Sequence, residues 1–385
     1  MTSFLARLYA FKFFDSFILI VPLYAVMFVD AGLTPVQISV ALIAWSATAF
    51  TLQIPSGVIA DRWSRRHILA LAQLARAAGF VVWLLYPHFW GFLAGLVLWG
   101  IKSAFTSGTF EALLYDELKA QGSAFDYTRI YGRARAVQAA GVVLAALGAA
   151  AVARHGYSLE LAASLGSISF AVAAALSLPP ADKARMASEH DYLTHLRLGL
   201  RLSLREPVVL SILLFSAIVL ALGGALEEFW PIFGIKVGLQ RPLIAVFVGV
   251  QSATEMLASL IAHRVSRLST RRIYGLFTLG GAMLAVAAGL SPPAMILLAL
   301  YSGLLKMIDV VFEGRLQQAI PSDRRATIGS VKGFAGEIGV TGLYLVFGPL
   351  AQATSYRTAF TACGAAGIAI GLTYLARARG RGRPG

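Results

Sequence analysis

A short signature occurs twice in this chain, at positions separated by just over half its length. The stretch 59–65, Ile-Ala-Asp-Arg-Trp-Ser-Arg, lies between two apolar runs, and the stretch 261–267, Ile-Ala-His-Arg-Val-Ser-Arg, lies between two others. The dipeptide at 110–111, Phe-Glu, returns at 312–313 with the same offset. A chain of 385 residues that repeats in this way contains two copies of one unit, and the flanking apolar runs make that unit a bundle of membrane helices.

The composition supports a membrane protein. Hydrophobic residues make up 58% of the chain and charged residues 14%, whereas soluble domains contain about 25% charged residues. The formal charge of +14 does not indicate a nucleic-acid-binding protein, because the basic residues fall in short clusters between apolar stretches. We therefore expect membrane lipid, and no nucleic acid, as a partner.

The sequence has no pattern typical of an enzyme. The single cysteine, Cys363, excludes an intramolecular disulfide and a thiolate metal cluster. The six histidines are scattered without metal-ligand spacing, and the chain has neither a phosphate-binding loop nor a nucleophile motif. We therefore expect no catalytic residues, no cofactor, no bound metal and no step driven by ATP.

Hydrophobic segments of about 20 residues predict the membrane-spanning helices. The predicted fold is all-α, an integral membrane protein with twelve transmembrane helices in two pseudo-symmetric six-helix bundles. The first six spans are Phe13–Val29, Val36–Pro55, Ile68–Tyr86, Phe89–Tyr115, Ile130–Ala153 and Leu159–Leu178. The last six are Val208–Ile235, Leu243–Ala262, Ile273–Leu290, Ala294–Gln318, Thr327–Ala351 and Ala359–Ala376.

The positions of lysine and arginine predict the orientation in the membrane. With the N-terminus inside, the outer connections hold only Arg154, Lys236, Arg241 and Arg357. The positive-inside rule then places both termini in the cytoplasm, and we expect a bacterial cytoplasmic membrane. The predicted organisation is an N-terminal bundle at 1–178, a cytoplasmic linker at 179–207, a C-terminal bundle at 208–376 and a basic, disordered cytoplasmic tail at 377–385.

The stretch 57–66, Gly-Val-Ile-Ala-Asp-Arg-Trp-Ser-Arg-Arg, resembles the signature loop between the second and third helices of the major facilitator superfamily. The stretch 107–116, Ser-Gly-Thr-Phe-Glu-Ala-Leu-Leu-Tyr-Asp, is similar to the fourth helix of bacterial drug-efflux members. The resemblance implies two bundles around a central cavity that opens alternately to either side, lined by helices one, four, seven and ten. Helix five contains Gly141 and Gly148 but lacks the Gly-Pro motif that drug–proton antiporters often have there.

The signature loop predicts a gating latch. Its members are Gly57, Asp61, Arg62, Arg65, Arg66 and Asp116. The resemblance places the counterpart of Asp61 at the start of helix eleven, near Thr327, where the helix dipole favours an anion. The arginines can pair with Asp116 at the inner end of helix four, or can instead anchor the loop to anionic lipid. His263 replaces Asp61 in the second copy, which predicts an asymmetric latch.

Charged residues within the lining helices form a second set of candidates, because a charge in hydrocarbon is costly and usually faces a cavity or a partner. These substrate or proton candidates are Asp15, Lys102, Glu111, Glu227, Glu228, Lys306, Asp309 and Glu313. Lys306, Asp309 and Glu313 share one helix face, and a Lys306–Asp309 pair that needs no substrate is the alternative interpretation. We favour Asp309 and Glu313 as the proton site, followed by Glu227 and then Asp15. Glu255 and Glu337, in helices eight and eleven, are lesser candidates for a proton site or for hydrogen bonds between helices.

Acidic and aromatic residues on the lining helices suggest the class of substrate. The aromatic residues are Phe13, Phe14, Tyr24, Trp99, Phe105, Phe110, Phe229, Trp230 and Phe312. An acidic, aromatic surface suits an organic cation or an amphipathic compound. The alternative is that these rings only pack against other helices or face lipid.

Together these features predict a secondary active transporter that works as a monomer and exports a small organic compound in exchange for protons, as multidrug-resistance antiporters do. One alternative is proton-coupled uptake or facilitated transport of a metabolite. Another, from a different class, is a membrane sensor that uses a transporter scaffold without transport, or an integral lipid-handling protein.

Overall fold

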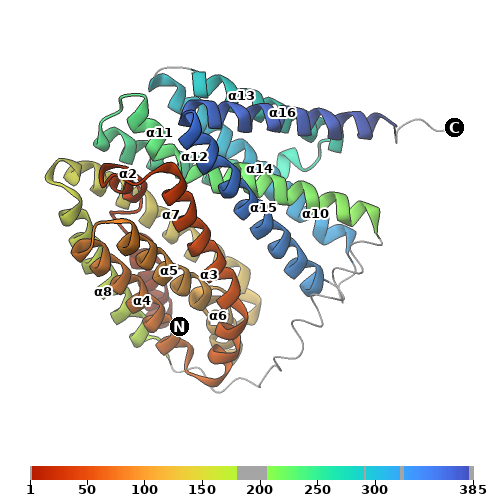
Figure 1. Cartoon of the computed structure of the whole chain (residues 1–385). Helices are drawn as coiled ribbons and strands as arrows, with labels where there is room; N and C mark the ends of the chain where they lie inside the picture. The colour runs from red at the N-terminus through yellow and green to blue at the C-terminus, as the bar shows by residue number, and fades with distance from the viewer. Residues whose placement is uncertain (1, 180–205, 290–291, 321–324, 381–385) are drawn as a thin grey trace. The chain divides into compact units, whose positions relative to one another are not determined.

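The computed structural model describes residues 2–179, 206–289, 292–320 and 325–380, and every regular element within them is a helix (Figure 1). The first half contains α1 (Thr2–Ser16), α2 (Tyr24–Asp30), α3 (Pro35–Arg62), α4 (Arg65–Leu85), α5 (Phe89–Thr106), α6 (Thr109–Ala120), α7 (Tyr127–Val152) and α8 (Tyr157–Ser177). The second half contains α10 (Pro207–Leu220), a π-helical turn (Ala221–Ala225), α11 (Trp230–Lys236), α12 (Arg241–Val265), α13 (Thr270–Gly289), α14 (Met295–Ala319), α15 (Arg325–Ala353) and α16 (Tyr356–Gly380). The all-α fold predicted from the sequence is confirmed for this part of the chain.

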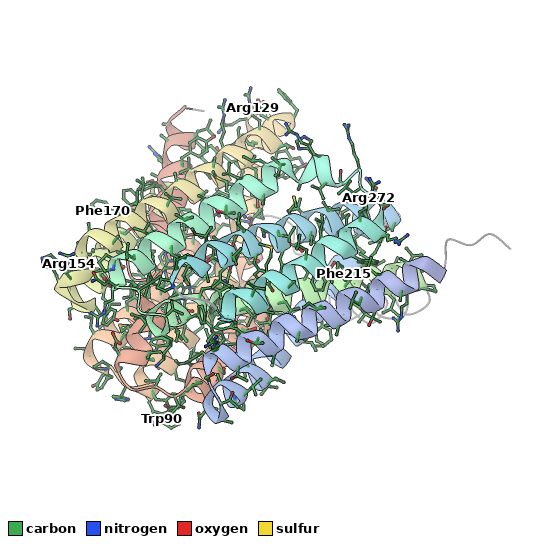
Figure 2. The ribbon with its side chains drawn as sticks, turned by 90° about the horizontal axis from the view of Figure 1, so that it is seen from above. Trp90, Arg129, Arg154, Phe170, Phe215 and Arg272 are labelled. Carbon is green, nitrogen blue, oxygen red and sulfur yellow. The ribbon has the colours of Figure 1, made fainter. Side chains whose placement is uncertain are left out.

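The helices have the length and surface of membrane spans. Eleven helical stretches of the described residues are long and apolar enough to cross a membrane. Large apolar side chains lie exposed on the outside of the ribbon, among them Trp90 at 69% and Phe170 at 61% exposure (Figure 2). Lipid tails solvate such a surface, whereas water does not. The chain is therefore a multi-pass membrane protein.

The chain forms two compact units, each with its own packing. Unit 1 comprises Met1–Leu33, Val40–Tyr192 and Arg241–Gly249. Unit 2 comprises Thr34–Ser39, Leu193–Gln240 and Val250–Gly385. Residues 180–205, most of the predicted linker, lie outside the described residues. Helix α16 continues to Gly380, so residues 377–380 are helical although we expected a disordered tail, and 381–385 also lie outside the described residues.

The span predicted at 13–29 is not one continuous helix, because α1 ends at Ser16 and α2 begins at Tyr24. Side chains of α8 satisfy backbone groups that this break leaves unpaired. The Ser167 hydroxyl donates to the Phe14 carbonyl at 3.0 Å, and Ser164 Oγ accepts the N–H of Ile20 at 3.0 Å. Non-helical backbone at membrane depth is tolerated only where such partners exist, so α8 makes the break possible.

Two further predicted spans are interrupted. The span at 89–115 divides into α5 and α6 at Gly108, whose φ of 76° is a left-handed conformation that glycine adopts without strain. The span at 208–235 passes from α10 through the π-helical turn to α11. Pro231 has no N–H to donate and therefore suits the first turn of α11. The hydrophobic pattern locates these spans but not their interruptions.

Close helix packing in unit 1 depends on glycine. A Cβ at Gly141 of α7 would lie 2.8 Å from the carbonyl oxygen of Phe13 near the end of α1, and one at Gly79 of α4 would lie 2.9 Å from the carbonyl oxygen of Gly95 in α5. Neither backbone could move away easily, so larger residues would push the helices apart. The packing therefore holds α4, α5 and α7 close to their neighbours.

Unit 2 has a tight helix pair and an aromatic core. Helices α13 and α16 lie side by side (Figure 1), and a Cβ at Gly281 would lie 2.9 Å from the carbonyl oxygen of Gly364. Phe215 of α10, labelled in Figure 2, packs against Tyr274, Phe277 and Phe312 with ring centroids 4.9, 5.0 and 4.5 Å away. These rings fix α10 against α13 and α14.

Candidate functional site

A buried ion-pair cluster occupies unit 1 at the end of α1. Asp15 Oδ1 lies 2.8 Å from Lys102 Nζ of α5 and 3.1 Å from Arg76 Nη2 of α4. Gln73, one helical turn before Arg76, donates to the same carboxylate oxygen at 2.7 Å. Asp15, Gln73 and Arg76 are each less than 9% exposed. A buried carboxylate is stable only with such partners, so the three helices are joined here by charge as well as by packing.

Positive charge exceeds negative charge around Asp15. Besides Lys102 and Arg76, Lys12 of α1 is buried and its Nζ lies 3.8 Å from the centroid of the Phe110 ring. Glu111 also acts on Lys12, so three cations accompany two carboxylates in this part of unit 1. On the predicted lining helices themselves Lys12 and Lys102 balance Asp15 and Glu111, so the excess of acid that we expected is not found in this group.

Unit 2 contains a pair of carboxylates held by one amide. Gln251 of α12 donates from Nε2 to Glu227 Oε2 and to Glu255 Oε1, at 3.1 Å in both cases. Glu227 follows the π-helical turn at the end of α10, and Glu255 lies one helical turn after Gln251. Both hydrogens of the Gln251 amide are therefore donated to oxygens of these two carboxyl groups.

Lys332 of α15 compensates the acids of α14. Its Nζ lies 2.6 Å from Glu313 Oε2 and 3.4 Å from Asp309 Oδ1. Lys306, on the same helix as both acids, reaches Asp309 only at 3.9 Å and its side chain is 44% exposed. The Lys306–Asp309 pair that the helix spacing suggested is therefore weak, and Lys332 is the principal partner of both acids.

A small polar pocket lies beside the carboxylate pair, within unit 2. Its volume is about 140 Å³. The residues that line it are Val219, Leu220, Gly223, Gly224, Glu227, Glu255, Ser302, Leu305, Lys306 and Asp309. The π-helical turn forms one wall, and the Tyr301 hydroxyl donates to the Leu222 carbonyl of that turn at 2.8 Å. Turns of this type are frequent at functional sites because they redirect the side chains that follow.

Two members of the predicted latch form an ion pair. Arg65, at the start of α4, pairs with Asp116 of α6, and Arg65 is buried. The side chains of Gly57, Asp61 and Arg62 lie outside the described residues, although α3 extends to position 62. The side chain of Thr327, the expected contact of Asp61, lies outside them too. The arginine–Asp116 contact is thus present, and the predicted contact of Asp61 stays a prediction.

The remaining acidic candidates lie in different surroundings. Glu111 of α6 accepts a long hydrogen bond of 3.4 Å from the Tyr131 hydroxyl, and within the described residues its second oxygen has no partner. Glu228 directly follows Glu227 and is one of the charged groups that act on it. Glu160 of α8, which the sequence did not indicate as a candidate, is completely buried, and neither of its oxygens has a hydrogen-bond partner in the described part of the chain.

Several aromatic candidates belong to the protein core. Phe110, Phe229, Trp230 and Phe312 are at most 1% exposed, and Trp230 stacks on Phe360 with centroids 5.1 Å apart. Rings that are this closely covered have no face available for a ligand. For these four residues the packing alternative holds, and the prediction that they would form a binding surface is wrong.

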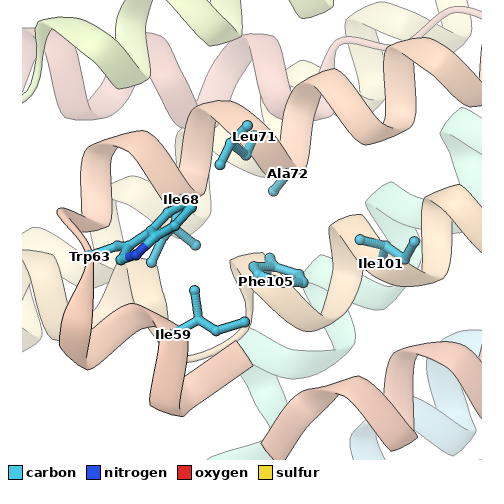
Figure 3. A pocket seen from close by; sticks show the side chains of 7 residues that line it. All are labelled: Ile59, Trp63, Ile68, Leu71, Ala72, Ile101 and Phe105. Carbon is cyan, nitrogen blue, oxygen red and sulfur yellow. The ribbon is translucent and has the colours of Figure 1, made fainter. Parts of the chain in front are cut away.

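An apolar pocket in unit 1 lies near the signature loop (Figure 3). Its volume is about 390 Å³, and its lining comes from α3, α4, α5 and the loop after α3. The lining residues are Ile59, Trp63, Ile68, Leu71, Ala72, Ile101 and Phe105. None of these side chains is charged, so this pocket contributes no site for a proton or an ion.

Four polar residues of these clusters were not recognised as candidates from the sequence. Arg76 and Lys332 lie within predicted spans and are charged, so the rule that intramembrane charges are functional candidates would have found them. We applied the rule to the four predicted lining helices and, outside them, only to the acids Glu255 and Glu337, so the basic residues of α4 and α15 were not considered. Gln73 and Gln251 gave no signal, because an uncharged amide within a span is recognised only when its partners are known.

Buried ion pairs inside membrane-spanning helices often mark substrate or ion pathways, as they do in membrane transport proteins. The model of the family described as "Major Facilitator Superfamily" matches residues 5–340 of this chain. The chain therefore belongs to the Major Facilitator Superfamily, as the signature loop suggested. Its drug-efflux subgroup stays a prediction.

Several solved structures of transporters share the fold of this chain. The structure of the nucleoside transporter NupG aligns with a TM-score of 0.79 at 16% identity, covering 97% of this chain and 98% of that chain. A D-xylose-proton symporter aligns with a TM-score of 0.70 at 13% identity, covering 96% of each chain. A POT family transporter in complex with 5-aminolevulinic acid aligns with a TM-score of 0.69 at 13% identity, covering 98% of this chain and 96% of that chain. At such low identities the TM-scores show a shared fold and nothing more. Comparison with curated proteins returns no significant match.

Proposed function

We propose that this protein is a proton-coupled secondary transporter that moves a small organic compound across the membrane by alternating access. The observation that supports the coupling is the Glu227–Gln251–Glu255 group, two carboxyl groups that share one amide at membrane depth. Two such groups resist simultaneous ionisation, so one proton can be bound and released by the pair. The other charged groups that act on Glu227 are Glu228 and Lys306.

This assignment changes the order of the sequence-based candidates. Asp309 and Glu313 were favoured because they share a helix face, but Lys332 contacts both and compensates their charge. Asp15 is similarly compensated by Arg76 and Lys102. Glu227 has no comparable cation at contact distance among the described residues, and is therefore the better proton carrier.

Transport by purified protein in proteoliposomes under an imposed pH gradient tests this proposal. Glu227→Gln and Glu255→Gln should each abolish accumulation driven by the gradient while retaining downhill exchange of substrate. Glu313→Gln is the matched control, because Glu313 lies on α14 but does not line the pocket, and it should retain accumulation. If Glu227→Gln accumulates substrate normally and Glu313→Gln does not, the proton site lies on α14. If no compound is transported under any gradient, the sensor alternative replaces the transporter.

The same experiment determines the direction of transport. The resemblance of the stretch 107–116 to drug-efflux members favours export in exchange for protons, and we propose this direction. Accumulation should then be fastest in vesicles with an acidic interior. Uptake together with protons, the alternative, requires an acidic exterior. We also propose that both termini lie in the cytoplasm of a bacterial cell, as the basic residues of the connections indicate.

The substrate that we propose is cationic or amphipathic. Acidic side chains outnumber basic ones around the pocket of unit 2, where Glu227, Glu255 and Asp309 accompany the single Lys306. An excess of negative charge in a site of low dielectric constant attracts a cation. The transport assay should therefore begin with organic cations.

A further inference from the structure

We infer that the pocket of unit 2 binds a primary ammonium group of the transported compound. The inference rests on the proposed function and specifies its substrate class, since a primary amine is only one kind of organic cation. Three observations support it. They are an unused buried hydroxyl, the arrangement of acids around it, and the nature of the remaining lining.

The hydroxyl belongs to Ser302 of α14. Ser302 is 4% exposed, lines the pocket, and its Oγ has no hydrogen-bond partner within the described part of the chain. A buried polar atom without a partner costs about 1–3 kcal/mol. A ligand with an N–H group that enters the pocket would provide the missing partner.

The acids supply further acceptors on the same pocket. Glu227 and Glu255 both line it, and Gln251 donates one hydrogen bond to each carboxyl group. An alkylammonium group has three N–H donors and no acceptor. With one proton shared by the two carboxyl groups, the pair carries one negative charge and, together with the hydroxyl, offers an acceptor for each of the three donors.

The rest of the lining distinguishes a primary from a quaternary ammonium group. None of the described residues that line the pocket is aromatic, whereas quaternary ammonium groups are recognised by cages of aromatic rings. The volume of about 140 Å³ corresponds to about four or five water-sized groups. The ammonium group and its first carbon atoms fit this space, and the remainder of the compound has to lie outside it.

Lys306 is the one cation among the described lining residues, and its positive charge repels an ammonium group that enters the pocket. Its Nζ lies 3.9 Å from Asp309 Oδ2, and nearly half of its side chain is exposed. Lys306 can therefore extend away from the carboxylate pair when a second ammonium group enters.

Ligand binding to the purified protein in detergent tests the inference. The probes are butylammonium and butyltrimethylammonium, which share a chain and a charge but differ in N–H donors. Binding of butylammonium should be stronger, and Ser302→Ala should weaken it about tenfold, as expected for one hydrogen bond to a charged group. Ser216→Ala is the matched control, because Ser216 is also buried with an unpartnered hydroxyl but does not line the pocket.

Several results would overturn the inference. They are equal binding of the two probes, equal effects of Ser302→Ala and Ser216→Ala, or unchanged butylammonium binding in Glu255→Gln. If Ser302→Ala does not fold, Ser302→Thr retains the hydroxyl and should retain binding, and Glu255→Gln still tests the acids. The assay requires neither a gradient nor flux. Normal butylammonium binding in a protein without proton-driven transport would therefore contradict only the proposed function.

Discussion

Arg76 binds Asp15 twice, through the carboxylate at 3.1 Å and through the backbone carbonyl at 2.9 Å. The carbonyl lies where α1 ends, so it lacks the helical partner that it would have in a continuous span. One guanidinium group therefore compensates a buried charge and also completes the hydrogen bonding of a broken helix. The break and the charge cluster depend on each other.

We predict that Asp15→Asn strongly destabilises the protein. The change leaves Arg76 and Lys102 buried without their shared anion, and removing one partner of a buried ion pair costs about 3–5 kcal/mol. The thermal unfolding temperature in detergent measures the effect. A double variant, Asp15→Asn with Lys102→Met, should recover part of the loss because one of the two unpaired cations is removed. An unfolding temperature equal to that of the wild type would contradict this account.

Glu160→Gln should have the opposite effect, although Glu160 is also a buried acid. Its carboxyl oxygens have no hydrogen-bond partner among the described residues, so the neutral amide breaks no hydrogen bond and leaves no ionisable group buried there. We expect an unfolding temperature equal to or higher than that of the wild type, in the same assay. A loss of stability as large as that of Asp15→Asn would show that Glu160 has a partner essential to folding.

The Arg65–Asp116 pair should act on transport through the attraction between its opposite charges. We predict that Asp116→Arg slows transport and that the exchanged variant, Arg65→Asp with Asp116→Arg, restores part of the rate. The expected coupling free energy is about 1–3 kcal/mol, as is typical for conformational switches. Initial rates in proteoliposomes of matched protein content provide the measurement. If the exchange restores nothing, the pair does not control transport by mutual attraction.

Lys332 and Lys306 should differ in their importance for stability. Lys332→Ala leaves Asp309 and Glu313 without their principal cation, whereas Lys306→Ala removes only a distant, half-exposed partner. We therefore expect a clearly lower unfolding temperature for Lys332→Ala than for Lys306→Ala. Adding Glu313→Gln to Lys332→Ala should recover part of the loss. Equal effects of the two lysine variants would exclude this assignment of partners.

Hydropathy predicted where the helices lie, because the length of an apolar run depends only on neighbouring residues. It did not predict that the first span breaks after Ser16, since the partners that permit the break, Ser164 and Ser167, come from α8. The charges of Asp15 and Lys102 were recognised as candidates, but their contact joins α1 and α5 and has no sequence signal. Contacts between distant helices determined which candidates became paired and which remained available.

The aromatic residues show the same limit. Phe229 and Trp230 directly follow the acids Glu227 and Glu228 in the sequence. We expected acidic and aromatic residues of the lining helices to form one binding surface. In the structure both rings are fully covered, while Glu227 faces a pocket without aromatic lining. Neighbours along a helix point in directions that differ by about 100°, so proximity in sequence does not imply a shared face.

The π-helical turn at Ala221–Ala225 has a consequence for chain length. A π-helical turn accommodates one more residue than an α-helical turn, and one residue corresponds to about 100° of rotation about the helix axis. Removing Gly223 or Gly224 would let α10 continue as a regular helix and would rotate Glu227 away from Gln251. A related chain with one codon fewer at this point could retain every acid of the pocket and still lack the carboxylate pair. Sequence alignments that allow no gap here would match residues whose side chains face different directions.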